Sequence, residues 1–350
     1  MGIFMNNINE IKGSKRIKYI DSLKGFAMIF VVIGHIADGY MGDSTGSAYN
    51  VWSNIYTYIY SFHMYLFMMV SGFLFSTAYI TENGGLKKDR LKKQIFNLLG
   101  VYVIFSVVMW LFKFVCGKIV NNSVSVKDML LIFGKTISPY WYLYVLIAFY
   151  LIFSVSKIRM LDDKIMLTAA FVLGLLSMFV NINNWFEIKR IMYYLLFFAM
   201  GVVYQRNRKS VFFSKGAVVI MIVVSAAMLP LLSIGDMNVY LKHTVKFLCA
   251  IGLSVMFFAT FEHIEVLSKV WIFNICGKYC LEIYVIHCIF TAAVRIVMDK
   301  VGIVNIPICL VANLLISTAA PIIISIICRK LNIHELFFKP YSFIKERINK

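Results

Sequence analysis

Residues 16–35, RIKYIDSLKGFAMIFVVIGH, decide the fold, because they have the length and apolar character of a membrane-spanning helix. The segment nevertheless carries Asp21, Lys24 and His35, and ionisable residues inside a span are costly and usually functional. At about 100° per residue, Lys24 and His35 share one helical face, roughly 16 Å apart along the axis, and Asp21 lies one turn before Lys24. The segment therefore predicts a cation near one membrane surface and an imidazole toward the other.

The composition is that of an integral membrane protein. Hydrophobic residues make up 61% of the 350 and charged residues 15%, against about 45–50% and 25% in ordinary soluble proteins. The formal net charge of +18 could indicate a nucleic-acid partner. However, the basic residues form short clusters between apolar runs, as the positive-inside rule requires, so we expect no nucleic-acid binding.

Apolar runs of near 20 residues recur along the chain and predict an all-α polytopic protein with about ten transmembrane helices. The predicted spans are 19–38, 55–80, 95–115, 140–156, 165–183, 190–204, 216–235, 242–261, 272–297 and 307–328. With the N-terminus in the cytoplasm, about 23 of the 35 Lys and Arg residues fall inside and about 10 outside, the bias expected of this orientation. An even number of spans returns the C-terminus to the cytoplasm.

This topology predicts three parts, with no internal repeat and no linker between two domains. They are a cytoplasmic N-terminal segment (1–18), a single transmembrane domain (19–328) and a basic cytoplasmic tail (329–350). The basic start followed by an apolar run resembles a signal peptide, but Asp21 and Lys24 would interrupt a signal core. We therefore expect the first helix to be retained.

Polar residues interrupt two further spans. His63 lies in the second span, and Glu282 and His287 lie in the ninth. On the predicted topology His35, His63 and His287 occupy the outer half of the bilayer, with Glu282 near mid-depth. A lone intramembrane histidine commonly makes a hydrogen bond between helices, so each has a structural alternative. Together they predict a titratable pocket that faces outward.

Cations gather at the opposite, cytoplasmic surface. Lys24 lies there with Arg90 and Lys93, which precede the third span. The plainer interpretation is that Asp21 and Lys24 form an ion pair within the helix, and that Arg90 and Lys93 only set the topology. The functional interpretation is an anion-binding mouth. It suits chemistry between a cytosolic anionic donor and an extracytoplasmic acceptor.

The remaining cysteines and histidines carry less information. Seven cysteines, mostly within apolar spans, predict free thiols and no disulfide framework. Cys276 and Cys280, with His287 further on, resemble metal ligands, but they lack a fourth ligand, so no metal is expected. Three other histidines are expected to be ordinary surface residues: His243, His263 and His334. The sequence contains no Walker A loop, dinucleotide fingerprint or G-x-S-x-G elbow.

Four motifs, in order, resemble the membrane acyltransferase family 3. YIDSLKG (19–25) followed by VVIGH (31–35) resembles the family's first helix, in which an Arg or Lys and a His are separated by ten residues, here Lys24 and His35. SFHMYLFMMVSGFLFS (61–76) is similar to its Phe-His-Met-Pro-Leu-Phe stretch ending in Ser-Gly-Phe. WYL (141–143) resembles its Trp-Phe-Leu, and CLEIYVIH (280–287) its Ile-Tyr-Leu-Ile-His. The resemblance covers almost the whole chain, and ten helices are the family's number.

The chain departs from the family pattern at three points. Tyr65 stands where the family often has Pro, which argues against a helix break there. The family's Arg-x-x-Arg pair is here Arg90 and Lys93, so a bidentate phosphate contact would be replaced by a point charge. No esterase-like domain follows the tenth span, so we expect the membrane domain, or a separate protein, to complete the transfer.

The resemblance implies a membrane-bound O-acyltransferase of the bacterial plasma membrane. Such an enzyme moves an acyl group, usually acetyl, from cytosolic acetyl-CoA or another acyl-CoA to a hydroxyl of a cell-surface polysaccharide or lipid-linked glycan. Membrane lipids and polysaccharide biosynthesis proteins are its expected partners. Two alternatives stay open: a transporter or flippase of a glycan intermediate, which should show broken helices in two related halves, and a non-catalytic partner of a polysaccharide synthase.

The resemblance also implies roles for individual residues. His35 would act as general base on the acceptor hydroxyl, or would carry the acyl group transiently. The implied catalytic set is His35, Lys24 and Asp21, with Asp21 orienting or neutralising Lys24. The implied donor-binding set is Lys24, Arg90 and Lys93. The implied acceptor-binding set is His63, Trp141, Glu282 and His287.

Overall fold

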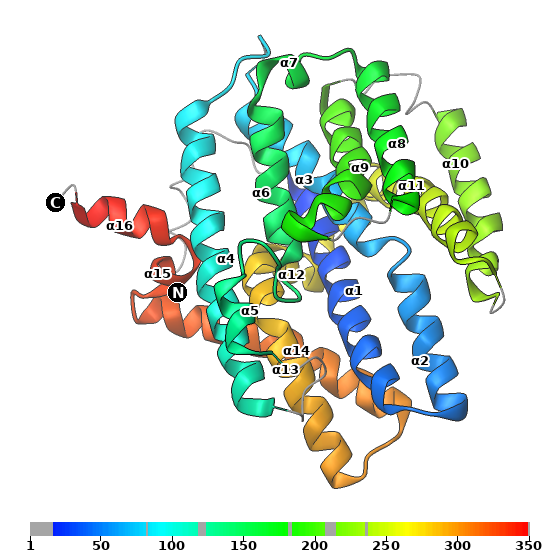
Figure 1. Ribbon diagram of the computed structural model, residues 1–350, viewed down its shortest axis with the longest axis vertical. Coiled ribbons are helices and arrows are strands. Elements are labelled where there is room, and N and C mark those ends of the chain that lie inside the picture. Colours follow the sequence, from blue (N-terminus) through cyan, green and yellow to red (C-terminus); the bar gives the residue numbers. More distant parts are fainter. Residues whose placement is uncertain are drawn as a thin grey trace.

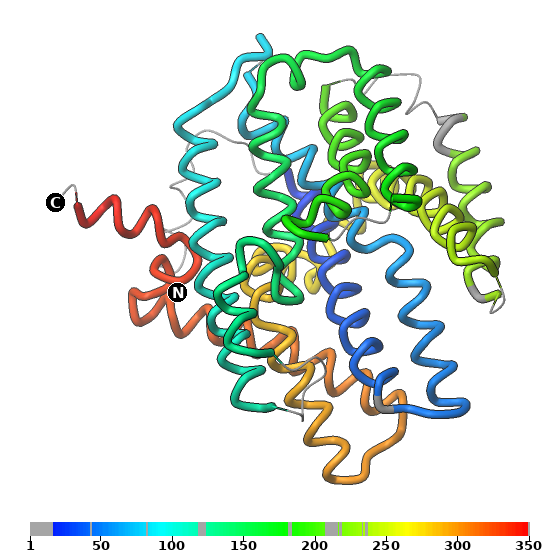
Figure 2. The backbone as a smooth tube through the Cα atoms, in the orientation of Figure 1, coloured from blue at the N-terminus to red at the C-terminus, as the bar shows by residue number. Residues whose placement is uncertain are grey.

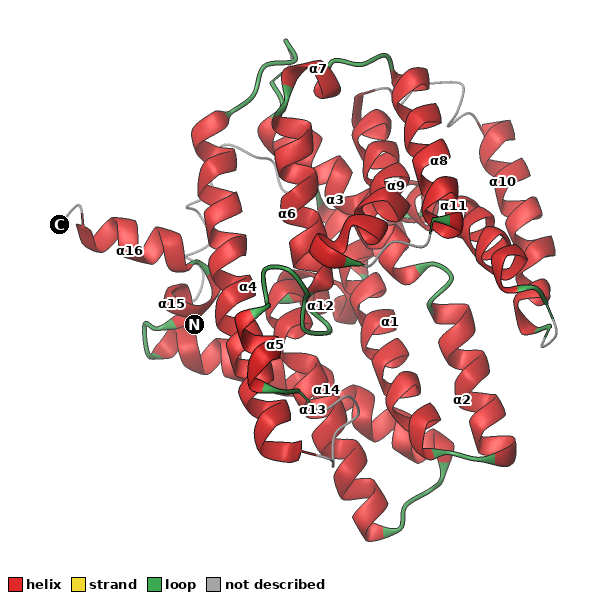
Figure 3. Cartoon of the chain, in the orientation of Figure 1, coloured by secondary structure: helices red, strands yellow, loops and turns green. Residues whose placement is uncertain are grey.

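The computed structural model describes residues 17–81, 83–117, 124–180, 184–206, 215–234 and 237–348. Within these ranges the regular elements are helices, and one isolated bridge pairs Ile80 with Leu86. Figure 3 shows helices joined by loops, without strands in the part of the chain that is described. The all-α prediction is therefore confirmed. Most of the predicted N-terminal segment, residues 1–16, lies outside the described ranges.

Long helices build the body of the protein, and short helices and turns connect them (Figure 1). The long helices are α1 (Lys18–Asp43), α2 (Gly46–Ile59), α3 (His63–Tyr79), α4 (Lys88–Cys116), α6 (Trp141–Ser154), α8 (Asp163–Phe179), α9 (Ile188–Arg206), α10 (Lys215–Met228), α11 (Val239–His263), α13 (Cys280–Val301) and α14 (Ile306–Lys330). The short elements are α5 (Val126–Leu130), α7 (Ser156–Arg159), α12 (Trp271–Lys278), α15 (His334–Phe338), α16 (Pro340–Ile348) and the 3-10 turns η3 (Trp185–Glu187), η5 (Leu229–Ser233) and η6 (Glu265–Lys269).

Six helical stretches of the described residues are long and apolar enough to cross a membrane. They are Lys18–Gly42, Gly46–Tyr79, Lys88–Cys116, Val239–His263, Cys280–Val301 and Ile306–Lys330. A multi-pass membrane protein fits this pattern. The other four predicted spans correspond to α6, α8, α9 and α10, which fall below that length or apolarity. The count of ten and the cytoplasmic location of both termini stay predictions.

Helix α1 lies in the interior of the bundle. It packs against α2, α3, α11, α12, α13 and α14, and Figure 2 shows it, in dark blue, in the middle of the molecule. Its buried residues lie on several sides, for example Leu23, Ala27 and Val32, none of which is exposed. Because neighbouring helices enclose α1, its polar side chains face protein groups or cavities, where their cost in the membrane is lowest.

A glycine contact brings α1 and α12 together. A Cβ atom added to Gly25 would lie 1.8 Å from the Phe273 carbonyl oxygen, and one added to Gly277 would lie 1.9 Å from the Asp21 carbonyl oxygen. Small residues allow this close backbone approach in membrane helices. The two helices therefore meet backbone to backbone beside Lys24.

Two of the predicted spans are broken, which corrects their prediction as continuous helices. Instead of one helix over 55–80, α2 begins at Gly46 and ends at Ile59, and α3 begins at His63. The break exists although Tyr65 replaces the family's Pro. It is stabilised locally because the His63 ring donates from Nδ1 to the Ile59 carbonyl oxygen, 2.7 Å away. The ninth predicted span, 272–297, is likewise divided at Tyr279 between α12 and α13.

The C-terminal tail packs against α4 and does not project freely. The Asn97 side chain of α4 donates to the Ser342 hydroxyl at 2.8 Å and accepts from the Ser342 backbone N–H at 3.1 Å. Phe96 and Tyr341 stack with ring centroids 5.1 Å apart. Figure 1 shows α15 and α16 beside α4 at the left edge. The basic tail is thus part of the folded structure near the start of α4.

Candidate active site

One face of α1 lines two cavities. Lys24, Met28 and Val31 line the first, which we call the central cavity. His35 lines the second, which we call the histidine cavity. Positions four, seven and eleven residues after Lys24 fall on the same helical face. Lys24 and His35 therefore share a face, as their spacing predicts, and each belongs to a different cavity.

The central cavity has a volume of about 290 Å³ and lies between α1, α3, α4, α6, α12 and α13. Most of its wall is apolar. Its polar groups include the Lys24 ammonium, the Gln94 amide and a hydrogen-bonded pair in which the Ser71 and Tyr142 hydroxyls are 2.7 Å apart. An apolar cavity with a few fixed polar groups suits a mainly apolar ligand chain.

Cations stand at the end of the central cavity where α1 begins. The Lys24 ammonium lies 2.7 Å from Oδ1 of Asp21 in the predicted ion pair, with 23% of the lysine side chain exposed. Lys278, at the end of α12, also lines this cavity. An ammonium group has three donors, so Lys24 can bind an anion while it keeps Asp21.

The histidine cavity is smaller, about 100 Å³, and more polar. His35 and Asp38 of α1, Lys113 of α4, and Cys288 and Arg295 of α13 contribute to its wall. Helices α1, α4 and α13 line both cavities and run in the same direction between them. The two cavities are thus consecutive along one set of helices.

His35 lies beside His287, with ring centroids 5.1 Å apart. His287 is fully buried, and its Nδ1 lies 2.9 Å from the carbonyl oxygens of both Ile283 and Tyr284. Carbonyl oxygens only accept, so the ring proton is on Nδ1 and Nε2 carries a lone pair. That Nε2 atom is 3.3 Å from Sγ of Cys288. The structure thus brings together two of the predicted site residues, His35 and His287, and adds a thiol.

These three side chains also have ligand atoms close enough together to hold a metal ion. One ligand atom each from His35, His287 and Cys288 lies within 4.8 Å of the other two. Two nitrogens and a sulfur match the preference of Zn²⁺ and would leave a coordination position open. Cys276 and Cys280, the cysteines considered from the sequence, are not in this group.

His63 is separated from His35 by an aromatic ring. Its ring lies 4.7 Å from the Tyr60 ring, and Tyr60 in turn lies 6.4 Å from His35. His63 is buried, bonds to the end of α2 and lines neither cavity. In this structure it bonds across the break between α2 and α3 and faces neither of these two cavities.

Trp141 also lines neither cavity. Its ring stacks on Tyr194 at 5.1 Å and is covered on the other side by the Arg190 guanidinium at 4.9 Å. An acceptor bound in either cavity would therefore not contact Trp141 directly.

Arg90 and Lys93 are exposed near the start of α4. Arg90 lies one helical turn before Gln94, which lines the central cavity. Lys93 lies one turn before Asn97, the residue that binds α16. Both cations are thus placed around the same end of the central cavity as Lys24 and Lys278.

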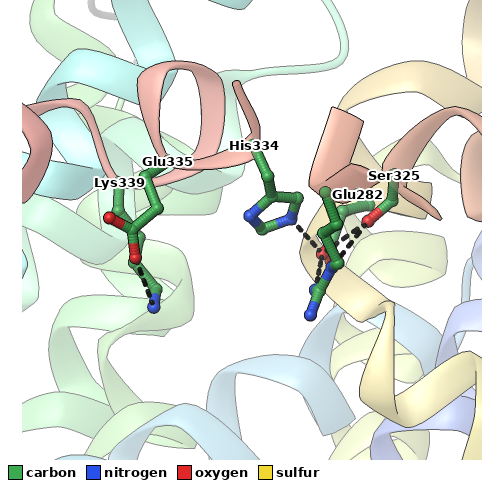
Figure 4. A network of polar contacts seen from close by, with 6 residues as sticks. Glu282, Ser325, His334, Glu335 and Lys339 are labelled. Atoms are coloured by element: carbon green, nitrogen blue, oxygen red, sulfur yellow. Dashed lines mark hydrogen bonds and ion pairs between the residues drawn. The ribbon is translucent and has the colours of Figure 1, made fainter. Parts of the chain in front are cut away.

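Glu282 lies in the first turn of α13, buried, and joins three partners from the C-terminal part of the chain (Figure 4). Its Oε1 accepts from Arg329 at 3.0 Å, from Ser325 at 3.2 Å and from His334 at 3.0 Å. Glu282 lines the central cavity together with Lys24 and does not line the histidine cavity. Glu282 therefore lies in the wall of the cavity that contains Lys24, whereas His35 lines the other cavity.

His334 corrects the expectation of an ordinary surface histidine. Only 12% of its side chain is exposed, and it donates from Nε2 to Glu282. Together with Arg329, these residues also border a surface pocket of about 590 Å³ formed by the tail. Glu282 belongs to both this pocket and the central cavity, so it stands at the boundary between them.

Replacement of Glu282 by glutamine should lower the free energy of unfolding by about 1–3 kcal/mol, because charge-assisted hydrogen bonds to Arg329 and His334 are lost. The cost stays below that of a fully buried pair because 46% of the Arg329 side chain is exposed. Thermal unfolding in one detergent measures the change. The control is Glu335→Gln, whose carboxylate is 44% exposed and pairs with Lys339 at 3.6 Å. Equal behaviour of the two variants would show that the Glu282 network is not stabilising.

Sequence reasoning missed two residues of the site, Lys278 and Cys288. Lys278 is charged within a predicted span, which is the same signal that identified Lys24. Cys288 directly follows His287, but a cysteine in an apolar run has the ordinary character of a small buried residue. Its relation to His35 depends on how α1 and α13 pack, which no local pattern encodes.

Comparison with known proteins identifies the chain's relatives at the level of a family. A family model described as an acyltransferase domain matches residues 17–328. The match extends from the start of α1 almost to the end of α14 and includes both cavities. No curated protein and no solved structure matches the chain.

Proposed function

Because this chain belongs to the membrane acyltransferase family 3, we propose that it transfers an acyl group, most often acetyl, from cytosolic acyl-CoA to a hydroxyl of a cell-surface polysaccharide or a lipid-linked glycan. The observation that carries the proposal is the pair of cavities along α1. One cavity has cations at its end, and the next contains His35. A charged donor and a hydroxyl acceptor can thus approach the reacting atoms from opposite ends.

The donor would enter at the end of the central cavity where α1 begins, which the positive-inside rule assigns to the cytoplasm. Lys24 and Lys278 line the cavity there, and Arg90 and Lys93 lie close by. These cations would hold the phosphates of CoA through charge-assisted hydrogen bonds. The pantetheine arm would then extend along the apolar wall and carry the thioester toward Val31, one helical turn from His35.

The acceptor hydroxyl would enter the histidine cavity. Its polar wall, with His35, Asp38 and Arg295, suits a hydroxyl-bearing ligand. His35 would remove the hydroxyl proton as the oxygen attacks the acyl carbonyl, and would pass that proton to the departing thiolate. His287, fixed by two carbonyl bonds, would hold the His35 ring in place.

This proposal uses only part of the acceptor set implied by the resemblance. His35 and His287 stand at the reacting end. His63 and Trp141 line neither cavity, and Glu282 lies at the donor end. We therefore assign Glu282 to the boundary between the tail pocket and the central cavity, where it would border the entering donor.

The test is transfer by the purified wild-type protein in lipid nanodiscs. With radiolabelled acetyl-CoA and surface glycan from deletion cells, we expect acetyl label in the glycan as an alkali-labile ester. A transporter or a non-catalytic partner would consume no donor. Parallel reactions with succinyl-CoA identify the acyl group, and NMR of polysaccharide from wild-type and deletion cells locates the missing ester. Absence of donor consumption with every acyl-CoA and glycan fraction would refute the proposed function.

A further inference from the structure

We propose that Cys288 is the acyl carrier of this protein: its thiol takes the acyl group from the donor and passes it, as a thioester, to the acceptor hydroxyl. The inference rests on the proposed function and adds a residue and an intermediate to it. It replaces the two earlier alternatives, direct transfer from the donor to the acceptor and transfer through an acylated His35, with transfer through an acylated Cys288. Two observations support it: the thiol contacts His287, and it lies in the histidine cavity close to the end of the central cavity.

Cys288 has a base within hydrogen-bond distance. Its Sγ lies 3.3 Å from Nε2 of His287, the ring nitrogen that carries a lone pair. The other nitrogen, Nδ1, is held by the carbonyl oxygens of Ile283 and Tyr284. A nucleophile next to a base that a third group orients is the arrangement that activates cysteine in covalent catalysis. His287 can therefore accept the thiol proton without changing its tautomer.

Cys288 lies in the wall of the histidine cavity, close to the end of the central cavity. It lines the histidine cavity, as His35 does. Tyr284, one turn earlier on α13, lines the central cavity, so the end of the donor cavity lies about 6 Å along the helix from the thiol. The side chain is half-buried, whereas His287 is fully buried. Of the two neighbours His287 and Cys288, the thiol is thus the one with access to a cavity.

The first step is a thioester exchange that balances without any other reactant. His287 Nε2 takes the Cys288 proton, and the thiolate attacks the acyl carbonyl carbon of acyl-CoA. A bond forms between this carbon and Sγ, and the bond from the carbon to the CoA sulfur breaks. His287 returns its proton to the CoA sulfur, so free CoA leaves and Cys288 holds the acyl group.

The second step uses His35. The acceptor hydroxyl gives its proton to His35 as its oxygen attacks the thioester carbon on Cys288. The bond between that carbon and Sγ breaks, and the proton passes to the released thiolate. The products are an ester and the original thiol. Each substrate then occupies its own cavity at a different time, which suits two cavities that are distinct in the structure.

The exchange of radiolabelled CoA into acetyl-CoA, without acceptor, tests the first step. We expect the wild-type protein to catalyse exchange, and Cys288→Ala and Cys288→Ser to lose both exchange and transfer to the background measured without protein. His35→Ala should lose transfer but keep exchange. Cys116→Ala, a half-buried cysteine at the end of α4, is the matched control and should keep both activities. Thermal unfolding of each variant verifies that it is folded, and the serine variant preserves side-chain shape.

Intact-mass measurement and peptide mapping locate the intermediate. After incubation with acetyl-CoA alone, we expect one acetyl group on Cys288 that neutral hydroxylamine removes. Exchange without transfer to any glycan would support Cys288 and refute only the glycan acceptor. Transfer that persists in Cys288→Ala, transfer by the wild-type protein without exchange, or stoichiometric zinc that is lost in Cys288→Ala would each overturn the acyl carrier.

Discussion

Replacement of His35 by alanine should reduce transfer of the acyl group to glycan by about 10²–10⁴-fold, the contribution of a positioned general base. His35 is the imidazole that α1 presents to the histidine cavity, and its neighbours in that wall are Asp38, Lys113, Cys288 and Arg295. We expect the loss in kcat, and the KM for acyl-CoA should not rise. The reason is that the donor-binding cations lie in the other cavity.

The measurement is the initial rate of labelled ester formation by equal amounts of folded protein in nanodiscs. His243→Ala is the control, because His243 is an exposed histidine of α11 that lines neither cavity. Its rate should match that of the wild-type protein. A His35→Ala protein with wild-type kcat would remove His35 from the mechanism.

The shared face of Lys24 and His35 could be predicted because both lie on one helix. Helical periodicity fixes the angle between two residues of the same helix without any knowledge of the fold. The cost of burying charge then indicates that this face meets protein and not lipid. The structure agrees, since α1 is enclosed by six helices and this face lines two cavities.

The partners of Glu282 could not be predicted in the same way. Its contacts Ser325, Arg329 and His334 are far away in the sequence, and they meet Glu282 only because the chain breaks at Tyr279 and the tail folds back. Hydropathy merges α12 and α13 into one span and so places Glu282 near mid-depth. The break moves it to the first turn of a helix, where a carboxylate is also favoured by the helix dipole.

The position of Cys288 shows the same limit at the reacting centre. The motif predicts His287 on the ninth span, but only the packing of α13 against α1 places its ring 5.1 Å from His35. The conformation of the chain between His287 and Cys288 then places the Cys288 sulfur 3.3 Å from Nε2 of His287. Spacing within a helix is thus encoded locally, whereas contacts between helices depend on the packing.

Replacement of Gly25 by alanine should destabilise the protein by about 3 kcal/mol or more, at the upper end of the cost of overpacking. The new Cβ would lie 1.8 Å from the Phe273 carbonyl oxygen, whereas real Cβ contacts are essentially never below 3.0 Å. The obstacle is backbone, so α1 and α12 must move apart by more than about 1 Å. Alanine gains about 1 kcal/mol of helix propensity over glycine, which does not offset this clash.

Thermal unfolding and the fraction of protein that elutes as one species in detergent measure the effect. Gly216→Ala is the control, because a Cβ at this helical glycine of α10 meets no atom within 4 Å. It should leave the Tm unchanged or slightly higher. Equal Tm values for Gly25→Ala and Gly216→Ala would contradict the backbone contact between α1 and α12.

The double variant Gly25→Ala/Gly277→Ala tests whether the two glycines belong to one contact or stabilise the protein independently. Gly277 faces the Asp21 carbonyl oxygen in the same contact, so once one alanine has parted the helices, the second should cost less than it does alone.

The same contact should also affect donor binding. Lys24 directly precedes Gly25, Lys278 directly follows Gly277, and both lysines line the central cavity. Any folded fraction of the variants should therefore show a raised KM for acyl-CoA, since parting α1 from α12 displaces both cations. Additive losses of stability with an unchanged KM would show that the glycines act separately and do not shape the donor end of the cavity.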